Sequence, residues 1–269
     1  DSDQEDVYTV RTTVTLTGPL DTDRLRQALD TLLARHPNLR VGFWYEDLDR
    51  PVQFVAKDAT APFRVVDLEG TSTQDGREEI ARIEADESRE PFDLTSAPPL
   101  RCTLIRHTKS EHTLVLTNHH IILDGWSMPI LVRELMEIYA AGQAGAPLPP
   151  APAFRDHLAW LASRDIGAAE HAWAEALAEA PKSTEVLGSS PAPSPGGGDA
   201  SPHRVELSLS PEEEEDLTTA PSRIGVTVNT LVQTAWALVV SRHTGRHDVV
   251  FGATVSGRST GVAGTESMI

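Results

Sequence analysis

The chain has 269 residues and a net charge of -17 at pH 7, which argues against a nucleic-acid partner because such binding depends on clustered Lys and Arg. No stretch approaches the roughly 18 to 20 consecutive apolar residues that span a bilayer, and no signal peptide is visible, so no membrane partner is expected. A single cysteine, Cys102, excludes an internal disulfide and suits a reducing, cytoplasmic location.

The first 180 residues predict an alternating α/β order. Apolar residues at helical spacing indicate helices at 21–36, 75–89 and 128–141 and one or two Ala-rich helices at 154–180. Alternating or β-branched runs predict strands at 7–16, 40–45, 51–56 and 63–68. A hairpin is expected where 99–107 and 111–118 flank a short polar turn.

A second unit is expected after a Pro-, Gly- and Ser-rich segment at 181–202, which has the composition of a flexible linker. Beyond it we expect a strand at 203–209, a helix that starts at 210–217, a helix at 230–243 and a buried strand at 248–255. The inner face of the helix at 230–243 is expected to carry Leu231, Ala235, Leu238 and Val239. The length, above the usual size of about 100 to 200 residues for one domain, agrees with two subdomains, and we place them at 1–180 and 203–269.

The segment 118–127 reads Asn-His-His-Ile-Ile-Leu-Asp-Gly-Trp-Ser, with two adjacent histidines and an aspartate four residues after the second. Imidazole titrates near pH 6.5, so a held histidine can take a proton from an attacking amine or hydroxyl, or orient it toward a carbonyl. The aspartate and glycine are the candidate parts that hold it. The segment therefore predicts an acyl-transfer site.

The two histidines are expected to have different surroundings. Neighbouring side chains of a strand point to opposite faces, so if the strand at 111–118 extends into the motif, His119 and His120 cannot both line one pocket. One histidine acts and the other packs. Periodicity alone leaves open which one acts.

Two other interpretations compete with acyl transfer. A lone histidine is more often a satisfied core or surface residue than a catalytic one. A metal site is the sharper competitor, since His and Asp are both ligands. Adjacent histidines on a strand diverge, however, the spacing His-Glu-x-x-His is absent, and the chain has one cysteine, so no metal is expected.

The motif resembles the signature of the condensation domains of nonribosomal peptide synthetases, which is His-His-x-x-x-Asp-Gly, followed by Trp-Ser in many members. Three further stretches agree in order and rough spacing. Residues 35–43 resemble the family's Arg-His-x-x-Leu-Arg-x-x-Phe block, residues 154–160 its aromatic-x-Asp-x-x-x-Trp block, and residues 252–258 a strand and turn of its second lobe.

The resemblance implies an α/β fold, an α+β sandwich of two lobes like those of chloramphenicol acetyltransferase. Relative to the family, the first lobe is short of its opening segment, and the second lobe is truncated because its later blocks would lie beyond Ile269. We therefore expect a nearly complete first lobe and a partial second one.

The resemblance also implies an acyltransferase of antibiotic biosynthesis that forms peptide bonds. A donor aminoacyl or peptidyl thioester and an acceptor aminoacyl thioester would be carried on phosphopantetheine arms of an upstream and a downstream peptidyl carrier protein. Adjacent adenylation or epimerisation domains are further expected partners, and no bound cofactor is expected. The wording at 6–10 and 123–128 resembles the subgroup that follows an epimerisation domain and accepts a donor ending in a D-residue.

Two alternatives stay open within the same superfamily. One is an acyltransferase that uses coenzyme A, although it would not be expected to match the blocks at 35–43 and 154–160. The other is a non-catalytic docking domain of the same fold, although such domains tend to have lost the histidine that this chain keeps. An epimerisation domain shares the motif, but Trp126 directly after Gly125 favours condensation.

By resemblance, the catalytic set is His120, Asp124 and Gly125. His120 would act on the amine, either as a base or by positioning it, and Asp124 would orient the site through an ion pair for which Arg258 is a candidate partner. Gly125 would permit close backbone approach, and its amide could steer the thioester carbonyl. Arg35 and Arg40 are expected to be structural. The supporting residues are His119, Trp126, Ser127 and Arg258, with His119 expected to pack.

Overall fold

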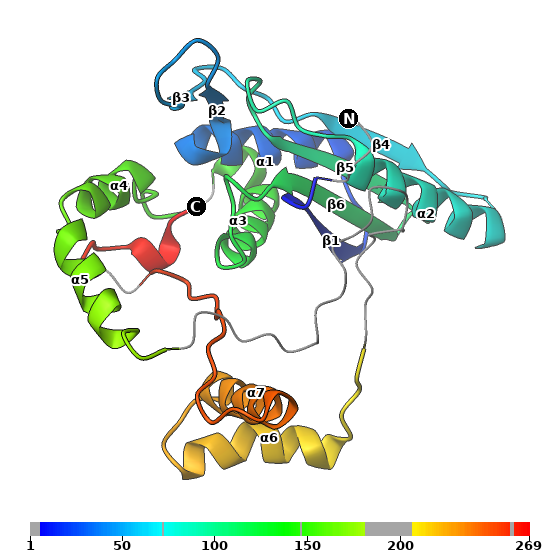
Figure 1. Cartoon of the computed structure of the whole chain (residues 1–269). Helices are drawn as coiled ribbons and strands as arrows, with labels where there is room; N and C mark the ends of the chain where they lie inside the picture. The colour runs from blue at the N-terminus through cyan, green and yellow to red at the C-terminus, as the bar shows by residue number, and fades with distance from the viewer. Residues whose placement is uncertain (1–5, 72, 146, 181–205, 259–260) are drawn as a thin grey trace, which may run out of the picture. The chain divides into compact units, whose positions relative to one another are not determined.

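The computed structural model describes residues 6–71, 73–145, 147–180, 206–258 and 261–269 (Figure 1). They form two compact units, one made of Asp1–Ser163 together with Ser256–Ile269, the other of Arg164–Val255. This division differs from the expected one because the last residues return to the larger unit. The expected linker at 181–202 lies outside the described residues.

The larger unit is built on a four-stranded sheet with the order β1-β6-β5-β4. β6 pairs antiparallel with both β1 and β5, and β4 runs parallel to β5, as Figure 1 shows. Thr9 lies opposite His119, so the end of β6 is flanked by the start of β1. The predicted strands and hairpin are confirmed. The strands are β1 (Thr9–Thr17), β4 (Phe63–Asp67), β5 (Leu100–Arg106) and β6 (Glu111–His119).

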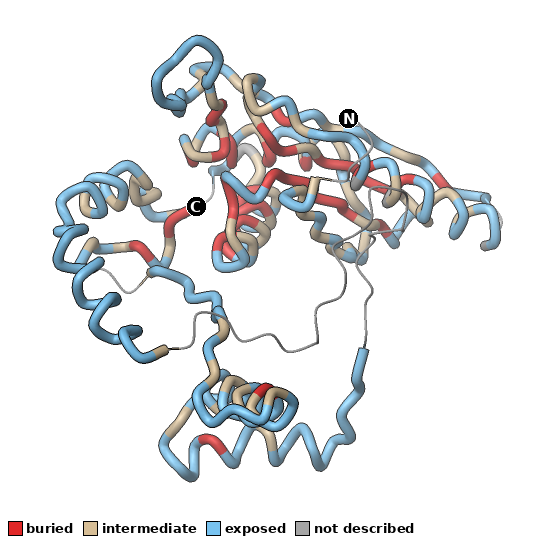
Figure 2. The backbone as a smooth tube through the Cα atoms, viewed as in Figure 1, coloured by how far each residue is buried: buried red, intermediate tan, exposed pale blue. Residues whose placement is uncertain are grey.

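Alternate side chains of β5 and β6 supply two cores, one on each face of the sheet (Figure 2). On one face, Leu104 and Leu116 pack with α1 (Thr22–Arg35) and α3 (Ser127–Ala141). On the other face, the core contains Ile105 and Val115 from the sheet and Ile83 from α2 (Thr73–Arg89). Since α3 begins soon after β6 ends, the loop between them joins two buried elements.

The start and the buried face of α1 follow from its sequence. The side chain of Asp21 accepts the backbone N–H of Arg24 at 3.0 Å, which satisfies an amide that the first turn leaves unpaired. Burial of a Leu side chain contributes about 1.5 to 3 kcal/mol, so this face holds the helix to the sheet. The predicted helix is confirmed. Its buried residues are Leu25, Ala28, Leu29, Leu32 and Leu33.

A short segment after α1 forms a separate two-stranded sheet. The 3-10 helix η1 (Pro37–Arg40) leads into β2 (Val41–Trp44), which pairs antiparallel with β3 (Val52–Val55). Arg40 donates from Nε to the carbonyl of Leu33 at 2.8 Å and from Nη1 to the carbonyl of Ala56. Arg40 therefore ties α1 to the end of β3. Its structural contacts agree with the sequence-based expectation.

Two predicted helices of the region beyond residue 205 are confirmed as α6 (Pro211–Arg223) and α7 (Val228–Thr244), in the smaller unit with α5 (Ile166–Ala176). α6 begins with a capping box, in which the Ser210 hydroxyl accepts the N–H of Glu213 and the Glu213 carboxylate accepts the N–H of Ser210. The helix α4 (Phe154–Ala162) belongs to the larger unit, so the predicted Ala-rich segment is two helices.

Three expectations for this region are wrong. The described residues 206–209 and 248–255 form no strand, because a strand needs a hydrogen-bonded neighbour and no described segment pairs with either. The expected inner face of α7 is also wrong, since Leu238 is 67% and Val239 45% exposed, while Val240 is buried. Helical periodicity marked an apolar helix but not the side that packs.

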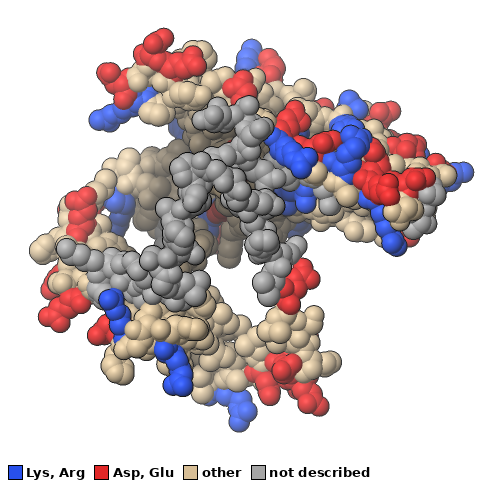
Figure 3. All heavy atoms as spheres, turned by 45° about the vertical axis from the view of Figure 1, so that its right-hand side comes forward, with Lys and Arg blue, Asp and Glu red and all other residues tan. Residues whose placement is uncertain are grey.

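Charged side chains of both signs are interspersed on the face drawn in Figure 3. On α2, Arg82 lies 2.5 Å from Glu79 and 3.0 Å from Asp86, and such exposed pairs contribute little to stability. Among the described helices, no single one is long and apolar enough to cross a membrane, and α6 with α7 pass that test only together, as a pair bent by 100°.

Candidate active site

The loop that carries the motif begins with a tight turn directly after β6. The N–H of Ile122 donates to the carbonyl of His119 at 3.2 Å, so His120 and Ile121 occupy the corners of the turn. The N–H of His120 donates to the carbonyl of Tyr8 at 2.7 Å, and the N–H of His119 to that of Pro99 at 3.1 Å. The turn is therefore anchored both to the residue before β1 and to the residue before β5.

The two histidines have different surroundings, as the alternation of a strand predicts. His119 is 8% exposed, whereas His120 is exposed. Nδ1 of His119 accepts the N–H of Ile121 at 3.1 Å, and its Nε2 lies 3.3 Å from a carboxylate oxygen of Asp6. Since Nδ1 accepts, the proton of the neutral ring is on Nε2, facing Asp6. The divergence of the two side chains is confirmed, and their catalytic roles stay predictions.

Asp124 closes the other end of the loop, where α3 begins. Its Oδ1 accepts the backbone N–H of Ser127 at 2.8 Å and the Ser127 hydroxyl at 2.6 Å. The first amides of a helix have no partner within the helix, so a side-chain acceptor here stabilises its start. Asp124 thus fixes the entry into α3 as well as its own carboxylate.

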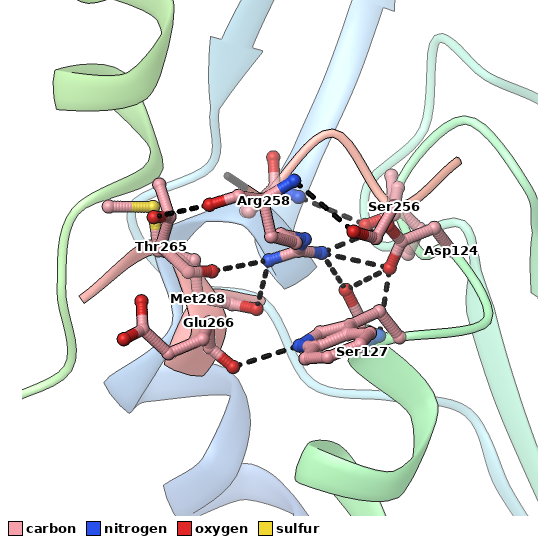
Figure 4. Close-up of polar contacts among 10 residues, drawn as sticks. Asp124, Ser127, Ser256, Arg258, Thr265, Glu266 and Met268 are labelled. Atoms are coloured by element: carbon pink, nitrogen blue, oxygen red, sulfur yellow. Dashed lines mark hydrogen bonds and ion pairs between the residues drawn. The ribbon is translucent and has the colours of Figure 1, made fainter. Parts of the chain in front are cut away.

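Asp124 and Arg258 form the ion pair that the sequence suggested (Figure 4). Nη2 of Arg258 lies 2.9 and 3.0 Å from the two carboxylate oxygens and 2.8 Å from the hydroxyl of Ser127. Nη1 donates to the carbonyls of Thr265 at 3.0 Å and Met268 at 2.8 Å. The guanidinium therefore joins the motif to the last residues of the chain.

The carboxylate of Asp124 is held in its ionised form. Burial raises the pKa of Asp124, but the hydrogen bonds from Ser127 and Arg258 lower it by more, so that the net pKa lies below its ordinary value. With its oxygens occupied by donors, Asp124 is suited to orient the loop rather than to accept a proton near neutral pH.

Two motif residues differ from what was expected. Gly125 does not have a positive φ, and a Cβ built on it would meet nothing within 4 Å, so neither backbone strain nor close packing of the chain requires glycine here. Trp126 was expected to pack under the helix, but it is 48% exposed, and its indole N–H donates to the carbonyl of Glu266 at 2.9 Å. The reason is that α3 begins at Ser127, which leaves Trp126 in the loop before it.

An open hollow of about 540 Å³ lies beside the ion pair, lined by Trp126, Ser256, Arg258 and residues 261–266. It offers a space next to the motif large enough for part of a substrate. Within the described part of the chain, no group of three or more His, Cys, Asp or Glu side chains is placed to hold a metal ion.

The block at 35–43 supports α3 from below the loop. Glu134, 5% exposed, accepts from Nε of Arg35 at 2.8 Å and lies 2.7 Å from Nε2 of His36, and both contacts involve the same carboxylate oxygen. Burial raises the pKa of Glu134, but Arg35 and His36 lower it by more, and burial lowers the pKa of His36. Arg35 is therefore structural in this fold, as expected.

Three residues outside the predicted set contact the motif loop: Asp6, Tyr8 and Asn38. The strand pattern at 7–16 places Tyr8 in the sheet, but the register of β1 against β6 brings its carbonyl to His120. No sequence signal identified Asn38 beyond its position inside the block at 35–43.

The fold and the site define a class of protein. The structure aligns with the solved first condensation domain of the calcium-dependent antibiotic synthetase at a TM-score of 0.76 and 24% identity, covering 97% of this chain and 60% of that one. The expected α/β fold, that of the chloramphenicol acetyltransferase-like condensation domains, is therefore confirmed.

The family follows from the sequence comparisons. The family model described as Condensation domain matches residues 2–269, so the chain belongs to the condensation-domain family. It is 33% identical to a linear gramicidin synthase of Brevibacillus parabrevis over 97% of its length and 35% identical to chondramide synthase cmdD of Chondromyces crocatus over 99%. The chain spans 3% and 7% of the length of these two relatives.

Proposed function

We propose that this chain forms peptide bonds in a nonribosomal peptide synthetase. The observation that carries the proposal is the match of the condensation-domain family over residues 2–269, with the motif His119 to Gly125 intact within it. The two relatives, the linear gramicidin and chondramide synthases, are biosynthetic enzymes by their names, which supports a biosynthetic reaction here.

In the proposed reaction, the amine of an acceptor aminoacyl thioester attacks the carbonyl of a donor thioester. A C–N bond forms, the C–S bond of the donor breaks, and the proton lost by the amine ends on the released thiol. Both reactants are carried on phosphopantetheine arms of carrier proteins, so tethering supplies much of the rate through proximity. The adjacent carrier, adenylation or epimerisation domains are the partners of this proposal.

His120 takes the catalytic role in this scheme. Its side chain is exposed on a turn whose backbone is anchored at both sides, which suits a group that must meet substrates arriving from outside. An imidazole in that position can orient the attacking amine and take its proton as the C–N bond forms. Asp124, paired with Arg258, orients the loop, and the open space at Gly125 leaves room for the thioester.

The experiment replaces His120 with Ala in the full-length protein and follows transfer between loaded carrier proteins by intact mass. We expect loss of product on the acceptor carrier with the fold unchanged. His171→Ala, which alters an exposed histidine on α5, serves as the matched control and should keep full activity. Undiminished product from His120→Ala would remove the catalytic assignment.

A further inference from the structure

All four backbone amides of the turn that carries His120 donate hydrogen bonds. Those of His119 and His120 reach the carbonyls of Pro99 and Tyr8, and that of Ile122 reaches the carbonyl of His119. That of Ile121 reaches Nδ1 of His119. These bonds hold the entry and the corners of the turn.

The exit of the turn is held from a different part of the chain. Nδ2 of Asn38 donates to the carbonyl of Ile122 at 2.9 Å, and the contact is partly buried and joins residues 84 positions apart. The side chain of Ile122 itself is buried, at 4% exposure. The hydrogen bond therefore fixes a backbone group on the inner side of the loop.

Asn38 is well placed to act as a fixed support. It lies in η1 between His36, whose ring contacts Glu134 of α3, and Arg40, whose guanidinium ties α1 to the end of β3. Its neighbour Leu39 is fully buried at 0% exposure. A side chain on such a segment transmits the position of the core to the loop it contacts.

Ile122 lies two residues after His120 and two before Asp124, so its carbonyl sits between the proposed catalytic imidazole and the ion pair. We infer that Asn38 is a positioning residue, which sets the orientation of His120 by fixing the carbonyl of Ile122. This inference rests on the proposed function, since His120 must act for its position to matter. A displacement of about 1 Å in a reacting group can cost about 100-fold in rate.

The test compares two substitutions, Asn38→Ala and Asn38→Asp, in the full-length protein. Asp keeps the shape of Asn but places an ionised oxygen against the Ile122 carbonyl, whereas Ala only removes the donor. A donor role therefore predicts that kcat falls about 10-fold for Ala and further for Asp, with KM for the loaded carriers unchanged. A role in packing alone predicts the opposite order, because Asp fills the space that Ala leaves empty.

The matched controls are Asn229→Ala and Asn229→Asp, which make the same changes at an exposed position of α7. They should keep the wild-type kcat. The two Asn38 variants should keep a Tm within about 4 °C of wild type. Loss of the cooperative transition in either variant would make Asn38 a folding residue and overturn the positioning role.

A second measurement does not depend on activity. Hydrogen exchange of a peptide covering 118–126 should be faster in Asn38→Ala than in wild type and unchanged in Asn229→Ala, because the exit of the turn loses its anchor. If the wild type made no product, the proposed function would fail, while exchange would still report on Asn38. Unchanged exchange, unchanged kcat, or a kcat for Asn38→Asp at or above that of Asn38→Ala would each overturn the inference.

Discussion

The guanidinium of Arg258 contacts both carboxylate oxygens of Asp124, at 2.9 and 3.0 Å, across 134 positions of sequence. The same nitrogen reaches the hydroxyl of Ser127 at 2.8 Å, so a single side chain joins the motif, the start of α3 and the end of the chain. This arrangement makes Asp124 a brace for the loop in front of His120, and it determines how substitutions at either residue should behave.

We expect Asp124→Asn to lose stability and activity together, because the amide cannot accept from Ser127 and Arg258 as the carboxylate does. The coupling between Asp124 and Arg258 in a double-mutant cycle should be about 1 kcal/mol, since the Asp124 side chain is 41% exposed and solvent screens the pair. Urea unfolding and product formation measure the two effects. Asp156→Asn, at an exposed carboxylate of α4, is the control. A fully stable but inactive Asp124→Asn would make Asp124 a direct participant instead.

The buried pair of His36 and Glu134 predicts a pH dependence of stability. Burial lowers the pKa of His36 in the folded state below the ordinary value of about 6.5, so the unfolded chain binds more protons as the pH falls through that value. Stability conferred by neutral His36 is therefore present above about pH 6.5 and is lost as the pH falls below it.

The measurement is the free energy of unfolding of wild type and His36→Gln between pH 7.5 and 5.5. The wild type should lose more stability on acidification than the variant, and the gap between them should narrow at the lower pH. His171→Gln, at an exposed histidine, should follow the wild type throughout. Parallel curves for wild type and His36→Gln would show that this group does not titrate differently on folding.

Packing behind the motif should dominate the stability of the larger unit. Leu131 of α3 is 0% exposed and belongs to the core that α1, α3 and the sheet share. Leu131→Ala should therefore cost about 2 to 5 kcal/mol, through lost burial and the cavity left behind. Leu158→Ala, at a leucine of α4 that is 42% exposed, should cost well under half as much. Equal losses in urea unfolding would mean that the core around α3 is not well packed.

The resemblance of 6–10 and 123–128 to the subgroup that follows an epimerisation domain predicts selectivity for the donor. Donor carriers loaded with dipeptides that differ only in the configuration of the last residue should give about 10-fold more product with the D-residue. Intact mass of the acceptor carrier measures both in parallel. Equal product from the two donors would place the chain outside that subgroup.

Local elements followed closely from local patterns. The helix α1 and the hairpin of β5 and β6 were predicted within a few residues, because their apolar side chains recur at the spacing of one buried face. The alternation of a strand also predicted that His119 and His120 diverge. The prediction failed for strands at 206–209 and 248–255, because an apolar run indicates burial but not a partner to pair with.

The site was only partly predictable for the same reason. The motif identified His120 and Asp124, and the resemblance suggested Arg258, but Asp6, Tyr8 and Asn38 carry no pattern that marks them. Their contacts depend on the register of β1 against β6 and on where η1 ends beside the loop. Trp126 was placed under α3 in error, because the helix begins one residue later.

The sequence by itself determined the family, the order of the helices and strands of the larger unit, and the residues that carry the proposed chemistry, since these depend on residue types at short spacing. The tertiary structure alone decided which distant groups hold those residues in place: the Tyr8 carbonyl on the amide of His120, Asn38 on the carbonyl of Ile122, and the geometry of Arg258 on Asp124. The physical reason is that a hydrogen bond needs its partners within about 3 Å, and only the packing of sheet and helices brings residues so far apart in sequence to that distance.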